Sequence, residues 1–212
     1  MNKAEQLPGR SKGQADAPKR KEILDGARQV FRAAGFDGAS MDKIAQVAGV
    51  SKGTLYVYFH NKEELFLELV HVDRKEAAEQ IFLREDDEID VATMLQELGE
   101  KFLTMMIQPS HVALVRMVIG AAEKFPEAGQ TFFEMGPCFG IDRLAAYLER
   151  QASRGRIVLN EDPKLAAAHF LNLCHGDVVK RLLFGYAEQP SRADVRATVD
   201  SAVRVFLKAY GA

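Results

Sequence analysis

Apolar side chains recur every three or four positions along almost the whole chain, which is the spacing of helices that bury one face. No stretch shows the alternation of apolar and polar residues that is typical of strands. The sequence therefore predicts an all-α protein, with three helices in an N-terminal head and six in a larger body. The nine expected helices span residues 19–34, 41–48, 52–59, 62–82, 91–108, 111–124, 132–151, 165–184 and 192–207.

Several helix starts carry residues that cap helices well. Ser40, Ser51 and Ser191 can each accept a backbone N–H at the beginning of a helix. Asn61 begins a variant of the capping box, in which a glutamate follows three residues later. Inside the long helix 132–151, Gly136–Pro137 predicts a kink.

Residues 40–59 read as two short helices joined by a turn at Gly49. In the second helix Leu55 and Phe59 lie four residues apart on one face, so we expect both to pack inward. Isolated helices shorter than about 12 residues are only marginally stable in water, so this one must be held in place by packing. Such a corner is the geometry that places the second helix in a DNA major groove, but many small helical proteins also contain one.

Charge is distributed unevenly along the 212 residues, although the formal net charge is only -2. Residues 1–60 carry ten Lys/Arg against six Asp/Glu, whereas residues 61–212 carry eighteen against twenty-four. A basic head on an acidic body is expected when only one end meets phosphates. We predict a flexible basic tail over residues 1–18, a DNA-binding domain over 19–64 and a second domain over 65–212.

The two cysteines, Cys138 and Cys174, are far apart, so neither a disulfide framework nor a zinc ribbon is expected. A polar cluster of His169, Cys174 and His175 has poor spacing for metal ligands on a helix. No stretch approaches the ~18 apolar residues of a membrane span. Motifs of phosphate-binding loops, nucleophile elbows and zinc proteases are absent from the sequence. We therefore predict a cytoplasmic protein without cofactor, metal or enzymatic activity.

The segment Ile44-Ala-Gln-Val-Ala-Gly-Val-Ser-Lys-Gly-Thr-Leu-Tyr-Val-Tyr-Phe-His-Asn-Lys-Glu-Glu-Leu65 resembles the signature of the TetR family of bacterial transcription regulators. The resemblance is strong over roughly residues 20–66. Beyond it, Gly120–Glu127 and Arg154–Ile157 resemble segments that are common in one branch of the family. The resemblance implies a homodimer, with an N-terminal DNA-binding head and a C-terminal body that binds a ligand and dimerises.

By this resemblance, nine residues in and around the second and third helices would line the DNA. Among them, Lys52 and Thr54 are the best candidates to contact base edges, whereas Tyr56 and Tyr58 can donate to phosphates. The full set is Ser40, Lys43, Lys52, Gly53, Thr54, Tyr56, Val57, Tyr58 and Lys62.

The middle helices contain many methionine and phenylalanine side chains, which can line an adaptable apolar pocket or form an ordinary core. With the family resemblance, we predict a pocket for a small amphipathic organic effector. Its expected lining is Met94, Leu98, Phe102, Met106, Met117, Phe132, Phe133, Met135, Phe139, Asn172 and His175.

The last two helices carry apolar residues on more than one face, and we expect them to pair with their symmetry mates in a four-helix bundle. Twofold symmetry then requires a pseudopalindromic operator, whose half-sites lie about 34 Å apart. The resulting prediction is a ligand-responsive regulator, most simply a repressor that its effector releases from double-stranded operator DNA. The alternatives are a small-molecule sequestering protein and, more distantly, an enzyme.

Overall fold

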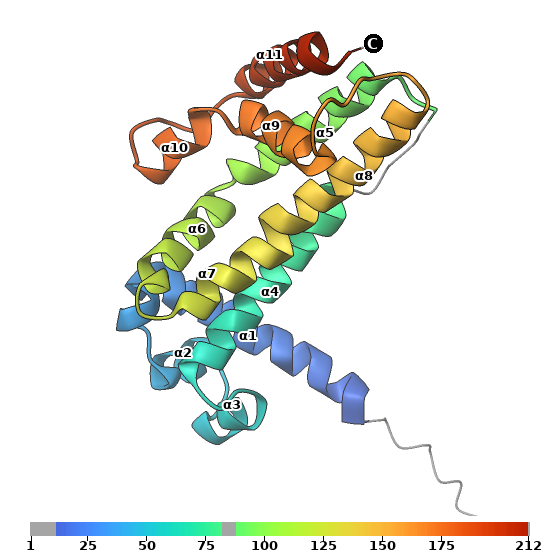
Figure 1. Ribbon diagram of the computed structural model, residues 1–212. Helices are drawn as coiled ribbons and strands as arrows, with labels where there is room; N and C mark the ends of the chain where they lie inside the picture. The colour runs from blue at the N-terminus through green and yellow to red at the C-terminus, as the bar shows by residue number, and fades with distance from the viewer. Residues whose placement is uncertain (1–11, 82–87, 212) are drawn as a thin grey trace, which may run out of the picture. The chain divides into compact units, whose positions relative to one another are not determined.

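The computed structural model describes residues 12–81 and 88–211, and within them the chain is all-α, as predicted. Figure 1 shows the order of the helices along the chain. An isolated bridge between Ile157 and Gly211 is the only β pairing in the described part of the chain. The helices are α1 Lys12–Gly38, α2 Met41–Val47, α3 Lys52–Tyr58, α4 Lys62–Ile81, α5 Val91–Met106, α6 Pro109–Ala122, α7 Pro126–Phe133, α8 Phe139–Ser153, α9 Pro163–His175, α10 Val178–Leu183 and α11 Arg192–Tyr210.

The helix count differs from the predicted nine because two expected helices are divided. The long helix begins earlier, at Pro126, and a π-helical turn over Glu134–Cys138 separates α7 from α8 where Pro137 predicted a kink. The helix expected over residues 165–184 is interrupted at Gly176, whose φ of 48° is not helical. A glycine accepts such a φ without the steric cost that a Cβ would impose.

Two expected helix starts were placed wrongly. Residues 12–18 continue α1, so the predicted tail is helical there, while residues 1–11 of that tail lie outside the described part. Helix α6 begins at Pro109, two residues before the start expected at residue 111, and its N-cap position is Gln108. The caps at Ser40, Ser51 and Ser191 are confirmed, and Ser191 forms a complete capping box with Asp194.

The chain divides into two compact units, one up to Leu69 and the other from Val70 onward. The boundary falls inside α4, five residues after the end that we predicted for the DNA-binding domain. In the first unit, α1 supplies a core of Ile23, Ala27 and Phe31, all fully buried. The Phe31 and Phe66 rings meet edge to face, with centroids 4.9 Å apart.

In the second unit, α5, α8, α9 and α11 pack together around one apolar core. Phe170 of α9 and Phe206 of α11 meet edge to face at 5.4 Å. Gly99 of α5 permits this packing, because a Cβ there would lie 2.6 Å from a methyl carbon of Val199. In the described residues no single helix is long and apolar enough to cross a membrane, and only α5 and α6, bent by 64°, pass that test as a pair.

Candidate functional site

The start of α3 is fixed by hydrogen bonds from its own caps. Thr54 N–H donates to Ser51 Oγ at 3.0 Å, and the two hydroxyls lie 2.7 Å apart. The start of α2 is held in the same way, because Lys43 N–H donates to Ser40 Oγ at 3.3 Å. The first turns of both short helices are thereby fixed by the serine that precedes each of them.

One side of α3 anchors the helix and the other faces solvent. Leu55 and Phe59 are buried, as predicted, and the Arg20 guanidinium lies over the Phe59 ring at 5.2 Å. On the opposite side Val57 is 78% exposed and Tyr56 43% exposed, and Gly53 next to them is also exposed. The short helix therefore presents a free rim that a duplex could contact.

The other predicted DNA-contact residues differ in how accessible they are. Lys43 and Lys52 are exposed, and Tyr58 is half-buried. Lys62 is also half-buried, and its ammonium donates to the Phe36 carbonyl at 2.8 Å while lying 4.4 Å from the Phe36 ring centre. Lys62 thus ties the start of α4 to the end of α1, a structural role that the sequence did not reveal.

The second unit contains a cavity of about 410 Å³, within the range of roughly 300–1,000 Å³ that is typical of small-molecule sites. Helices α4 to α10 and the π-helical turn supply its walls. Seven of the eleven residues predicted for a pocket line it, and Met94, Leu98, Met117 and Met135 do not. The seven are Phe102, Met106, Phe132, Phe133, Phe139, Asn172 and His175.

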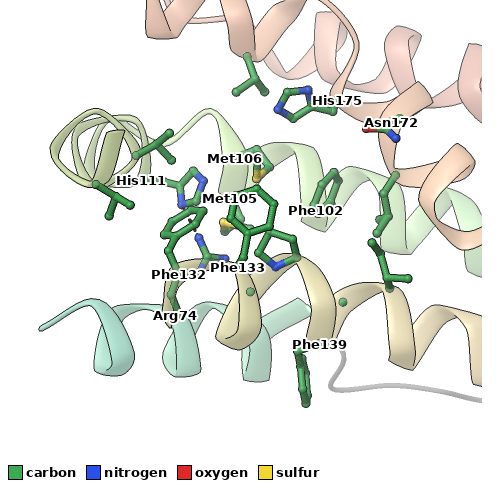
Figure 2. A pocket seen from close by; sticks show the side chains of 18 of the residues that line it. Arg74, Phe102, Met105, Met106, His111, Phe132, Phe133, Phe139, Asn172 and His175 are labelled. Atoms are coloured by element: carbon green, nitrogen blue, oxygen red, sulfur yellow. Dashed lines mark hydrogen bonds between the residues drawn. The ribbon is translucent and has the colours of Figure 1, made fainter. Parts of the chain in front are cut away.

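The polar groups of the cavity come from two sides. Figure 2 shows Arg74 and His111 beside Phe132, with Asn172 and His175 across the cavity. The Arg74 guanidinium lies 4.8 Å from the Phe132 ring centre. Most of the remaining lining is aliphatic or aromatic, so the cavity suits an amphipathic molecule.

Arg74 and His111 line the cavity, but neither was among the residues predicted from the sequence to do so. A signal was present in each case. Arg74 continues the buried stripe of Phe66 and Val70 at four-residue spacing, and His111 occupies the same face of α6 as Leu114 and Val118. A polar residue on an apolar stripe is more informative than an exposed one.

The two residues form a buried pair. An Nη1 proton of Arg74 is donated to His111 Nδ1 at 3.1 Å, and the two residues are 4% and 7% exposed. Burial lowers the pKa of Arg74 to about 10, although the negative charge of Asp73 acts to raise it. Burial, followed by the charges of Arg74 and His175, lowers the pKa of His111 to about 3. At neutral pH the arginine is therefore charged and the histidine neutral.

The cluster that invited a metal interpretation is dispersed in the structure. His169 Nδ1 lies 2.9 Å from the Tyr210 hydroxyl, whereas Cys174 is buried and burial raises its pKa to about 12. His175 instead lines the cavity. Across residues 12–81 and 88–211, no group of three or more His, Cys, Asp or Glu side chains is arranged to hold a metal ion.

Family models match most of the chain. Residues 23–69 match the model of bacterial regulatory proteins of the tetR family, and residues 93–212 match the C-terminal domain of AefR-like transcriptional repressors. The chain is 40% identical over 63 residues to the HTH-type transcriptional repressor AcnR of Corynebacterium jeikeium, a match that covers 30% of this chain and 33% of that relative. The chain thus spans about a third of the length of this curated relative.

Two solved structures are similar over nearly the whole chain. A TetR-family transcriptional regulator from Mesorhizobium loti is 30% identical, with a TM-score of 0.84, over 92% of this chain and 98% of the other. The flavonoid-responsive regulator FrrA is also 30% identical, with a TM-score of 0.80 and the same coverage of both chains.

Proposed function

The chain belongs to the TetR family of bacterial transcription regulators, and on this premise we propose that it is a repressor that binds a pseudopalindromic operator as a dimer and is released by a small amphipathic effector. The DNA-binding part of this proposal rests on one observation, which is that α3 has one buried side and one solvent-exposed side. Leu55 and Phe59 hold the helix, while Lys52, Tyr56 and Val57 remain accessible. An anchored short helix with an accessible N-terminal rim is the arrangement that reads a major groove.

Selection of bound duplexes from a random pool tests this proposal directly. We expect the recovered sites to contain two inverted half-sites, whose centres are about 10 base pairs or a small multiple apart. Affinity for the recovered site should fall steeply as salt rises, because bound cationic groups displace counterions from the phosphates. Recovery of no enriched sequence, with no salt-dependent binding, would contradict the proposal.

The cavity supports the effector part of the proposal. Its volume and mostly apolar lining suit a small organic molecule, and the relative FrrA is described as flavonoid-responsive. Helix α4 contributes Lys62 to the first unit and Arg74 to the cavity of the second, so it is the element through which an effector can act on the head. An effector must favour one arrangement of the protein, and coupling of about 1–3 kcal/mol is typical.

Dimerisation through the last helices forms the third part of the proposal. Val195, Val199 and Phe206 of α11 are buried in the protein's own core, so the interface must use other faces of these helices. The apolar side chains that remain exposed are Leu165 and Leu173 of α9, Phe184 and Tyr186 after α10, and Val205 of α11. We assign the dimer interface to these side chains, because contiguous exposed apolar surface commonly marks protein interfaces.

A sequestering protein that merely binds a small molecule is the alternative, and the cavity by itself is equally compatible with that function. Duplex binding separates the two functions. A sequestering protein has no affinity for the selected DNA at any salt concentration, whereas a regulator loses this affinity only when salt or effector is added.

A further inference from the structure

The most unusual feature of the cavity is Arg74, which pairs with no carboxylate of the described residues, although the negative charge of Asp73 next to it in the chain acts on it. Within the described part of the chain, no aspartate or glutamate lines the cavity and Arg74 forms no ion pair. Buried charges in proteins are normally paired, because an isolated ion loses its hydration without compensation. The Phe132 ring face, 4.8 Å from the guanidinium centre, offers partial stabilisation but accepts no proton.

Hydrogen bonding is also incomplete at this end of the cavity. A guanidinium carries several N–H donors and no acceptor, so His111 Nδ1, 3.1 Å from Nη1, must be the accepting atom. The proton of the neutral imidazole therefore resides on Nε2. Arg74 Nε and His111 Nε2 are both buried, and neither has a hydrogen-bond partner among the residues that the structure describes. Two neighbouring donors among these residues thus lack acceptors beside a buried positive charge.

Close neighbours from three elements keep the Arg74 guanidinium in place. The π-helical turn brings Gly136 so close that a Cβ there would lie 2.7 Å from Arg74 Nε. Phe132 and His111 approach the same group from α7 and α6, as Figure 2 shows. A charged group held from three sides, with its charge directed at an apolar cavity, is arranged in advance for a ligand of opposite charge.

We infer that the cavity takes an amphipathic anion, such as an organic carboxylate, phenolate or sulfonate, whose acidic oxygen accepts from the Arg74 guanidinium while its apolar part fills the space between α5 and α8. His111 acts as a positioning residue, because it accepts from Arg74 and leaves the charge to the ligand. This inference rests on the proposed function, since it defines the chemical class of the effector. The effector is then recognised by its charge as well as by its apolar surface.

Two fluorescent probes with the same aromatic skeleton test the inference without knowledge of the natural effector. The anion 8-anilinonaphthalene-1-sulfonate carries a sulfonate that the neutral N-phenyl-1-naphthylamine lacks. Titrations of the full chain should show that Arg74→Gln weakens sulfonate binding roughly ten- to a hundredfold, the usual value of a hydrogen bond to a charged group. Binding of the neutral probe should be unchanged, and Arg32→Gln, at an exposed arginine of α1, should change neither affinity.

A second neutral variant, Arg74→Met, separates ligand binding from a structural role. Removing a buried charge that pairs with no described carboxylate should leave the unliganded protein at least as resistant to urea as the wild type. The inference is overturned if the wild type binds the sulfonate no better than the neutral probe, if both neutral variants keep its affinity, or if both unfold.

DNA binding is measured separately, so the two proposals can fail independently. Arg74→Gln should bind the selected duplex as the wild type does in the absence of ligand. Loss of sulfonate preference together with normal duplex binding supports the inference. A chain that never binds duplex refutes the regulator proposal, while the probe titrations still decide the charge of the ligand.

Discussion

The Lys52 ammonium lies 2.6 Å from the Asp42 carboxylate, so an ion pair joins α3 to α2 across the helix-turn-helix. Both side chains are more than half exposed, at 61% and 68%. The hydrogen bond to Asp42, and then its charge, raise the pKa of Lys52, which remains a cation throughout the physiological range. An exposed pair of this kind is weak, so it presents little obstacle to the base contact that we propose for Lys52.

We predict that Lys52→Ala relaxes the base preference at one position of each half-site. Lysine recognises guanine O6 and N7 in the major groove, and loss of such a contact typically costs about 1–3 kcal/mol of discrimination. The measurement is a comparison of the sites that the variant and the wild type select from a randomised operator library. Lys43→Ala serves as the control and should weaken all sites similarly, because we assign Lys43 to phosphate. An unchanged preference in Lys52→Ala would remove Lys52 from the base-reading set.

The same ion pair predicts an opposite effect for its acidic member. Asp42→Asn removes a negative charge beside the expected DNA surface and frees the Lys52 ammonium. Affinity for duplex of any sequence should therefore rise, most clearly at low salt where the charge is least screened. Asp25→Asn in α1 offers a comparison, because that carboxylate already receives hydrogen bonds from Lys21 and Arg28. Equal gains in both variants would mean that only net charge matters.

The helices of the first unit could be predicted well because each depends on local signals. Ser40 and Ser51 cap their helices as expected, and Leu55 and Phe59 are buried as their four-residue spacing implied. Gly35 takes a φ of 69° within α1, where the apolar pattern of the first helix stops. These features follow from a few neighbouring residues, so the sequence contains them almost completely.

The cavity could be predicted only in part, because its shape depends on contacts between helices far apart in the chain. Met94 and Leu98 share the apolar character of Phe102, yet they pack into the core while Phe102 lines the cavity. Periodicity identifies a buried face but does not say whether a neighbouring helix fills the space in front of it. Arg74 and His111 are 37 residues apart, and their pairing exists only in three dimensions.

Close packing of α1 against α2 leads to a prediction about stability. A Cβ at Gly26 would lie 2.6 Å from the Ala48 Cβ and 2.7 Å from the Ala48 backbone nitrogen. Gly26→Ala should destabilise the first unit by about 1–3 kcal/mol and weaken duplex binding, because backbone cannot yield as a side chain can. Urea unfolding and DNA titration measure both effects.

The matched control for Gly26 is Gly120 of α6, where an added Cβ meets nothing within 4 Å. Gly120→Ala should stabilise by about 0.5–1 kcal/mol, since glycine in a helix loses more conformational entropy on folding than alanine. A loss of stability in this variant, equal to that of Gly26→Ala, would show that crowding is not the cause.

The exposed Phe184 predicts where dimerisation can be disrupted. Its side chain is 88% exposed, and Arg116 holds the preceding turn by donating to the Leu182 and Leu183 carbonyls at 2.6 and 2.9 Å. An exposed apolar group of this kind is suited to an interface, so Phe184→Glu should shift the proposed dimer towards monomer in sedimentation experiments. Val57→Glu places the same charge on an exposed apolar residue of the other unit and should leave the oligomeric state unchanged. A Phe184→Glu dimer as tight as the wild type would place the interface elsewhere.

His111 makes the stability of the second unit depend on pH. Its pKa is about 3 when folded, whereas an unfolded histidine titrates near about 6.5, so below the latter value only the unfolded chain gains the proton. The stabilisation is complete above that unfolded pKa and is lost progressively as the pH falls towards 3. Between pH values of about 7.5 and 5, the free energy of unfolding should therefore fall by about 2 kcal/mol from this group alone. In His111→Gln, whose side-chain oxygen can still accept from Arg74, the decrease measured by urea unfolding should be smaller by that amount. If the two proteins lose stability equally over this pH range, His111 takes up a proton in the folded state as readily as in the unfolded state. The neutral imidazole that we place beside Arg74 would then be wrong.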